Sequence, residues 1–154
     1  MTRRSERGGV LLLFPAAVLV VVVLAAVAVD SSIAFLGERE LANATAAAAN
    51  DAAGRAVSEV AFYTYDSIEL DPAAVERVAV GRVLASLDTG RHHDLVIDAR
   101  ARPPASPGCA WTVRVTASSR VSYIFSGAVP GGPDSVAVEA TTVSGPQQSD
   151  TKAC

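Results

Sequence analysis

Cysteine, lysine and aromatic residues are scarce in this chain of 154 residues, and their scarcity excludes several classes of protein. The two cysteines, Cys109 and Cys154, lie far apart and lack the short spacing of a metal-binding pair. Lys152 is the only lysine, and the formal net charge is −3. Because the chain has no basic stripe with interleaved aromatic residues, nucleic-acid binding has no electrostatic basis in this sequence.

Motifs for catalysis and cofactor binding are also absent from the sequence. His92 and His93 are adjacent, so on a strand their side chains point to opposite faces and are poorly placed to share a metal ion. We predict a solvated loop at this pair. No serine lies in a G-x-S-x-G motif, and Gly131 and Gly132 lie between prolines, which indicates a turn. We therefore predict no catalytic residue, no cofactor, no metal site and no small-molecule substrate.

One long apolar run without charge covers residues 10–29. A helix rises about 1.5 Å per residue, so a run of this length spans the roughly 30 Å hydrocarbon core of a bilayer. Pro15 lies near one end of the run, where its cost is small beside the insertion free energy of the valines and leucines. The sequence therefore predicts a transmembrane helix over 10–29 with the lipid bilayer as its partner.

The flanks of the run predict its orientation. Arg3, Arg4 and Arg7 precede the run, and Asp30 follows it. The positive-inside rule keeps the arginine-rich side in the cytoplasm. We therefore predict a cytoplasmic N-terminus over residues 1–9, a single membrane crossing and an extracytoplasmic remainder.

A cleaved secretory signal is the main alternative for the same run. Ala26 and Ala28 form an A-x-A site, and cleavage there would release a soluble protein that begins at Val29. The apolar run is longer than that of a usual signal peptide, and helix-favouring sequence continues through the site. We therefore favour retention in the membrane over release.

An alanine-rich stretch after the membrane segment predicts a long helix, assigned to residues 30–66. Between residues 31 and 60 there is no proline, and Gly37 and Gly54 are the only glycines. One approximate apolar face is formed by Ile33, Leu36, Leu41, Ala44, Ala48 and Ala52. This face fits either packing of the helix on its own domain or lateral assembly with other long helices.

Residues 67–145 predict a small α+β domain. Asp71 and Pro72 are a favourable N-cap and first helical residue. Apolar residues at helical spacing extend this helix to Leu87, namely Val80, Val83, Leu84 and Leu87. About four strands follow, near residues 95–101, 111–116, 121–125 and 136–142, and we expect them to pair as an antiparallel sheet.

The polar tail over residues 146–154 is predicted to be flexible unless Cys154 is tethered. Outside the cytoplasm a disulfide between Cys109 and Cys154 is permitted. Closing a loop of this size stabilises the fold by about 4 kcal/mol in the chain-entropy account. Two unpaired thiols are the alternative.

Three segments in this order resemble the TadE/TadG-like proteins of tight-adherence (Flp, type IVb) pilus systems. They are Arg7-Gly8-Gly9 before the apolar run, Ala28-Val29-Asp30 followed by Glu38 to Ala44, and the strand-like stretches 111–115, 121–127 and 136–140. The resemblance implies a minor pseudopilin or assembly component of a pilus or secretion machine in the bacterial cytoplasmic membrane. It also implies pilin-like partners, contacted through the alanine-rich helix, and no catalysis.

One position departs from the pattern of processed pilins. If prepilin peptidase cleaved between Gly9 and Val10, the position that usually carries glutamate would be Phe14. We therefore expect an unprocessed, permanently anchored component. The alternatives are an anchored binding module unrelated to pili and a secreted hydrolase released after Ala28.

Overall fold

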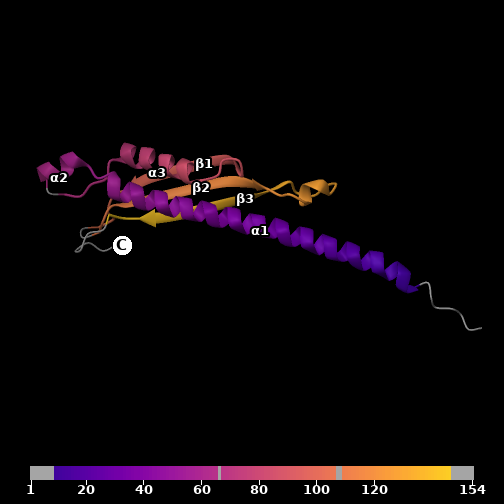
Figure 1. Ribbon diagram of the computed structural model, residues 1–154. Coiled ribbons are helices and arrows are strands. Elements are labelled where there is room, and N and C mark those ends of the chain that lie inside the picture. Colours follow the sequence, from indigo (N-terminus) through magenta and orange to yellow (C-terminus); the bar gives the residue numbers. More distant parts are fainter. Residues whose placement is uncertain (1–8, 66, 107–108, 147–154) are drawn as a thin grey trace, which may run out of the picture.

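A computed structural model describes residues 9–65, 67–106 and 109–146 of the chain. Its helices are α1 (Gly9–Arg55), α2 (Glu59–Tyr65) and α3 (Pro72–Ser86). Its strands are β1 (His92–Arg102), β2 (Thr112–Ser122) and β3 (Ser135–Ser144), with the short 3₁₀ helix η2 (Ser126–Ala128) between the last two. The strands form one antiparallel sheet in the order β1-β2-β3. Figure 1 shows α1 running past the sheet and projecting far beyond it. The expected α+β fold is confirmed.

The number of strands differs from the prediction, because the described residues form three strands and not four. The stretch expected near 111–116 and the start of the one expected near 121–125 belong to one strand, β2, which contains neither glycine nor proline and ends at Ser122. Residues 123–125 lie beyond the strand. Every second residue of β2 is buried from Val113 to Val121, and position 119 in this row is a serine. This polar residue interrupts the apolar alternation in the sequence but does not interrupt the strand.

The C-terminal half of α1 and the whole of α3 pack with the sheet around one core. The buried residues from the two helices include Leu41, Ala44, Ala48, Ala52, Val75, Ala79 and Val83, and those from β2 are Val113, Val115, Ala117 and Val121. Alanine side chains let α1 approach its neighbours closely, so the expected apolar face from Leu41 onward is buried within the chain's own domain. Leu36, which belongs to the expected face but precedes Leu41, is half exposed.

α1 ends at Arg55, so the range 30–66 holds two helices and not one. Beyond Arg55 the backbone pairs with a later segment: Ser58 N–H donates to the Glu69 carbonyl (2.8 Å), and Asp71 N–H donates to the Ala56 carbonyl (2.9 Å). The Ser58 hydroxyl then accepts from Ala61 N–H (3.3 Å), which makes Ser58 the cap of α2. These bonds replace the helical ones and stop α1.

The bounds and the N-cap of α3 agree closely with the prediction. The Asp71 carboxylate accepts from Ala73 N–H at 3.0 Å, and Pro72 is the first helical residue. The buried face consists of Val75, Ala79 and Val83, whereas Leu84 is half exposed. The helix is therefore rotated relative to the face that the sequence spacing favours.

Candidate functional site: the apolar half of α1 and its junction with the domain

The first half of α1 is an apolar rod with almost no protein around it. From residue 13 to residue 29 nearly every side chain is exposed, including Phe14 at 74% and Leu19 at 65%. Among the described residues it is the one helix that is long and apolar enough to cross a membrane. A core helix of a soluble domain would be mostly buried, and only 6% of this apolar window is. An exposed apolar surface of this extent indicates a non-aqueous neighbour.

The residues predicted to orient and process this segment are only partly described. Arg3, Arg4 and Arg7 lie outside the described residues, so the orientation remains a prediction. Gly9 and Val10 form the start of α1, and the helix continues without a break through the possible signal-peptidase site at Ala28.

Asp30, predicted only as the polar end of the apolar run, connects α1 to the loop between β2 and β3. Its carboxylate is buried and accepts hydrogen bonds from the N–H groups of Ile124 (3.0 Å), Phe125 (3.1 Å) and Ser126 (2.7 Å). The Ser126 hydroxyl also donates to it. The carboxylate therefore binds the start of η2, where successive N–H groups converge on an anion.

The electrostatics of Asp30 follow from this geometry. Burial by itself raises the pKa of the Asp30 carboxyl, because it penalises the charged form. The hydrogen bonds from Ser126, Phe125 and Ile124 outweigh burial and lower the pKa below its ordinary value of 3.8. Asp30 is therefore a carboxylate held in its charged form by the loop.

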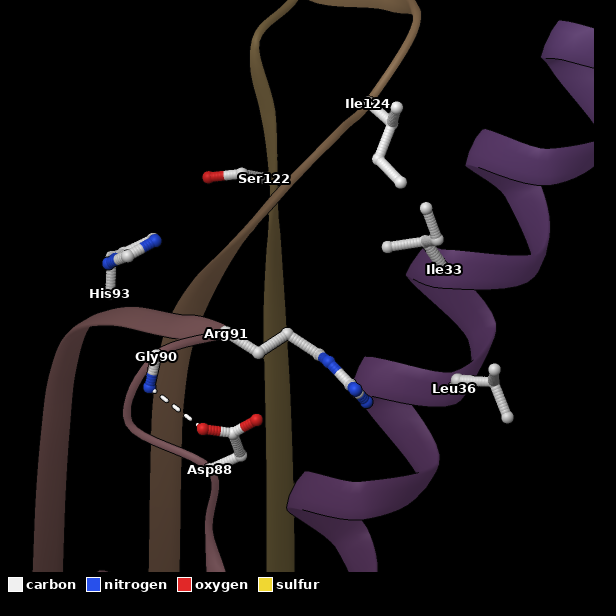
Figure 2. A pocket seen from close by; sticks show the side chains of 8 residues that line it. All are labelled: Ile33, Leu36, Asp88, Gly90, Arg91, His93, Ser122 and Ile124. Atoms are coloured by element: carbon white, nitrogen blue, oxygen red, sulfur yellow. Dashed lines mark hydrogen bonds between the residues drawn. The ribbon is translucent and has the colours of Figure 1, made fainter.

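A cavity of about 420 Å³ lies on the domain side of this junction, between α1 and the ends of β1 and β2. Figure 2 shows Ile33 and Leu36 of α1 and Ile124 on its apolar side, and Asp88, Arg91 and His93 around the rest. The Arg91 side chain reaches across toward α1, where its Nη1 lies 3.2 Å from Glu40 Oε2. Because the guanidinium is already paired, the cavity offers mainly apolar surface to a ligand.

Beside this cavity a row of polar residues, the buried Ser119 and His92 and the partly exposed Glu40, joins three elements. The His92 ring nitrogen Nδ1 lies 2.8 Å from the Ser119 hydroxyl, and its Nε2 lies 3.6 Å from Glu40 Oε2. The prediction of a solvated loop is wrong for His92, which is buried at the start of β1, and it is also wrong for the element, since both histidines belong to that strand. Strand geometry explains the difference between the two side chains: alternation turns His92 inward and leaves His93 exposed.

The order serine, histidine and carboxylate is that of a hydrolase triad, but here the serine and the histidine are buried. Ser119 is 4% exposed, and His92 is equally buried. The neighbouring cavity is lined by His93 and Ser122 and not by the two buried residues. A substrate therefore has no route to the Ser119 oxygen in this arrangement, and the geometry supports a structural role that ties α1, β1 and β2 together.

Metal ligands and Cys109 are the remaining chemistry-bearing groups of the described residues. Within the described ranges, no group of three or more histidine, cysteine, aspartate or glutamate side chains could hold a metal ion. Cys109 Sγ lies 3.1 Å from the Ser106 hydroxyl. Cys154 lies outside the described residues, so the predicted pairing of Cys109 with Cys154 stays a prediction.

Sequence reasoning missed two features of this site: the hydrogen bonds between Asp30 and the β2–β3 loop, and the contact of Glu40 with His92. Both depend on residues far apart in the chain. A weak signal for the first was present, since residues 121–133 contain no charge and are rich in glycine and apolar residues.

Comparisons of the chain with protein-family models, with curated proteins and with solved structures return no match.

Proposed function

We propose that this protein is a membrane-anchored structural subunit, a minor pseudopilin-like component of a Tad-type pilus or secretion system in the bacterial cytoplasmic membrane. The observation that carries the proposal is the form of α1. It is a continuous helix of 47 residues, bare and apolar over its first half and packed on its own domain over its second half. Such a helix holds a small domain at the membrane surface and leaves its first half free to pack against other helices in the lipid.

The energetic case for anchoring comes from the exposed side chains of α1. Burying one valine, leucine or phenylalanine away from water stabilises a protein by about 1.5–3 kcal/mol. The apolar half of α1 leaves many of these side chains exposed, and a bilayer covers them all at once. Arg3, Arg4 and Arg7 support an orientation with the N-terminus in the cytoplasm.

The proposed partner surface lies nearer the N-terminus of α1 than the alanine-rich stretch that was expected to form it. From Ala44 to Ala56 the buried alanines contact the chain's own domain. Inside the apolar half, small residues recur at Ala16, Ala17, Ala25, Ala26 and Ala28. Small side chains allow helices in lipid to approach closely, so we propose that pilin-like partners contact α1 there.

Topology is tested by adding protease to intact spheroplasts that carry the chain with a tag at each end. We expect loss of the C-terminal tag and protection of the N-terminal tag, because the folded domain lies outside. N-terminal sequencing of the membrane-bound chain shows whether it begins before Gly9, at Val10 or at Val29. A chain found mainly in the medium and beginning at Val29 would contradict anchoring.

Assembly is tested by photocrosslinking in membranes, with the photoreactive residue at Val22, which is 61% exposed. We expect crosslinks to the apolar N-terminal helix of another pilin-like protein, identified by mass spectrometry. The matched control places the same group at Arg77, an exposed position of α3. Equal crosslinking from both positions, or crosslinks only to unrelated membrane proteins, would contradict the proposed assembly.

The alternative function is an anchored binding module, and the cavity of Figure 2 is its specific support. Its wall of Ile33, Leu36 and Ile124 suits a small apolar ligand. This alternative predicts that a small apolar ligand stabilises the protein, that Leu36→Arg abolishes this stabilisation, and that Val22 gives no crosslink to a pilin-like protein. Pilus assembly predicts no ligand dependence.

A further inference from the structure

The loop between β2 and β3, residues 123–134, extends beyond the sheet along α1 toward its apolar half. Figure 1 shows this loop projecting past the strands in the same direction as the N-terminal part of α1. A cavity of about 260 Å³ separates the two, and its α1 wall is formed by Val23, Ala26, Val27 and Asp30. Phe125, Ser126 and Val129 are among the loop residues on the other wall. The loop therefore lies beside helix residues that belong to the proposed membrane segment.

The loop surface is mostly apolar, and its one charged residue is Asp134, at the end that joins β3. No charged residue occurs from 121 to 133, a stretch that includes both prolines of the loop. Ile124 is 65% exposed, Phe125 is 45% exposed and Val129 is 60% exposed. An exposed apolar tip directly beside an apolar helix forms one continuous surface with it.

Most backbone N–H groups of the loop have hydrogen-bond partners inside the protein. Asp30 accepts from the N–H groups of Ile124, Phe125 and Ser126. Further N–H groups donate to carbonyl oxygens within the loop: Tyr123 to Asp134 (2.9 Å), Ala128 to Phe125 (3.0 Å), Val129 to Ser126 (3.1 Å) and Gly132 to Val129 (2.8 Å). Irregular backbone near hydrocarbon requires such internal partners, because an unsatisfied group there costs several kcal/mol.

The depth of the loop follows from helix geometry. Val23 precedes Asp30 by about two helical turns, or roughly 10 Å along the axis. If the run 10–29 fills the hydrocarbon core, Val27 and Val23 lie roughly 3–10 Å inside its boundary, so loop residues beside them reach the outer part of the acyl chains. Tyr123, partly buried at the start of the loop, is of a residue type enriched at that boundary.

We propose that the β2–β3 loop inserts Phe125 and Val129 into the bilayer leaflet that faces the folded domain, as a second membrane contact beside α1. This inference rests on the proposed anchoring by α1. The occupant of the apolar surface is lipid, because the loop continues the lipid-facing surface of the helix at the depth of the leaflet. Because α1 and the domain share one core, two points of contact limit how far the domain can tilt relative to the bilayer.

The test uses tryptophan fluorescence of the full chain in phosphatidylcholine and phosphatidylglycerol vesicles, with some lipids brominated on the acyl chain. Trp111 is the only native tryptophan, and it is replaced by phenylalanine. A single tryptophan is then introduced by Phe125→Trp or, in a second protein, by Val129→Trp. Ala105→Trp, exposed in the loop before β2, is the matched control, and Val21→Trp marks the membrane segment.

We expect the tryptophans at positions 125 and 129 to lose intensity most strongly when bromine lies near the headgroup end of the chain. Val21→Trp should be quenched most by deeper bromine, and Ala105→Trp should not be quenched. If Val21→Trp is quenched but neither loop tryptophan is, the loop proposal is overturned and anchoring stands. If Val21→Trp is not quenched either, the anchoring proposal itself fails. Circular dichroism confirms that each variant is folded.

Discussion

Two buried polar side chains, Asp30 and His92, connect parts of the chain that are distant in sequence. Asp30 binds backbone N–H groups 94 to 96 residues further along. His92 contacts Ser119 on β2 and Glu40 on α1. The Asp30 carboxylate and the His92 ring are buried, so removing a hydrogen-bond partner from either leaves a desolvated group behind.

The lowered pKa of Asp30 predicts a pH dependence. Because the folded chain binds the proton less tightly than the unfolded chain, Asp30 stabilises the fold fully above about pH 4. This stabilisation is lost as the pH falls through the lower folded-state pKa. The stability difference between the wild type and Asp30→Asn should therefore be largest near neutral pH and shrink below about pH 4.

The measurement for Asp30 is thermal unfolding in detergent micelles, followed by the near-ultraviolet circular dichroism of Trp111. Asp51→Asn is the matched control, since Asp51 pairs with Arg82 at the surface. A difference between wild type and Asp30→Asn that stays constant across the acidic range would show that the Asp30 carboxylate does not act through its charge.

Ser119→Ala tests the buried row at the residue scale. The substitution removes the 2.8 Å partner of His92 Nδ1 and leaves that nitrogen buried without a hydrogen bond. We expect a loss of about 1–3 kcal/mol in the free energy of unfolding. Denaturant titration measures it, and Ser118→Ala, on the opposite face of β2, should cost much less. Equal effects of the two substitutions would contradict a specific role for the Ser119 hydroxyl.

At the scale of elements, the contact between α1 and β2 depends on a glycine. A Cβ on Gly37 would lie 2.7 Å from Val121 Cγ2, and Val121 is fully buried. The valine side chain is branched and stiff at χ1, so it cannot easily turn away. Gly37 therefore sets the distance at which α1 crosses the end of β2, about two helical turns after Asp30.

Gly37→Ala and Gly81→Ala are predicted to change stability in opposite directions. Alanine favours a helix over glycine by about 1 kcal/mol, and Gly81 in α3 has open space around its Cα. Gly81→Ala should therefore stabilise the protein. Gly37→Ala should destabilise it by about 1–3 kcal/mol, because overpacking outweighs helix propensity.

Thermal unfolding of both glycine variants measures these changes. The double variant Gly37→Ala, Val121→Ala should lose less stability than the sum of the two single losses, since the smaller residue makes room for the added methyl group. Stabilisation by Gly37→Ala alone would show that the helix and the strand separate without cost.

At the scale of the whole molecule, the two halves of α1 have different surroundings. The helix is bare over its first half and covered by the sheet and α3 over its second half. Figure 1 shows the resulting shape, a domain at one end of a projecting rod. The junction at Asp30 and Gly37 therefore fixes how the domain sits relative to the membrane in the proposed function.

Replacing Leu19 and Val20 together by arginine tests membrane retention. These residues lie at the middle of the run 10–29, where two arginines cost about 5–7 kcal/mol on the insertion scale. We expect the variant to leave the membrane fraction or to be degraded, as measured by fractionation and immunoblotting. The control Val60→Arg with Tyr63→Arg changes exposed apolar residues of α2 and should stay in the membrane.

The sequence by itself determined the apolar rod, the α+β class and the start of α3. The rod follows from the length and charge of residues 10–29, and α3 follows from the local cap at Asp71 and Pro72. Such features depend on a few neighbouring residues and on the repeat of helix or strand, so no distant contact is needed to predict them.

Only the tertiary structure decided that Ser119 continues β2, that His92 is buried and that Asp30 binds the loop. Each of these outcomes requires partners far away in the chain, and the free energy that buries a polar group comes from those partners. The sequence shows which residues are polar, but the fold decides which of them meet. For the same reason the loop between β2 and β3 reads as a turn in the sequence, and its place beside the apolar half of α1 is set by the carboxylate at position 30.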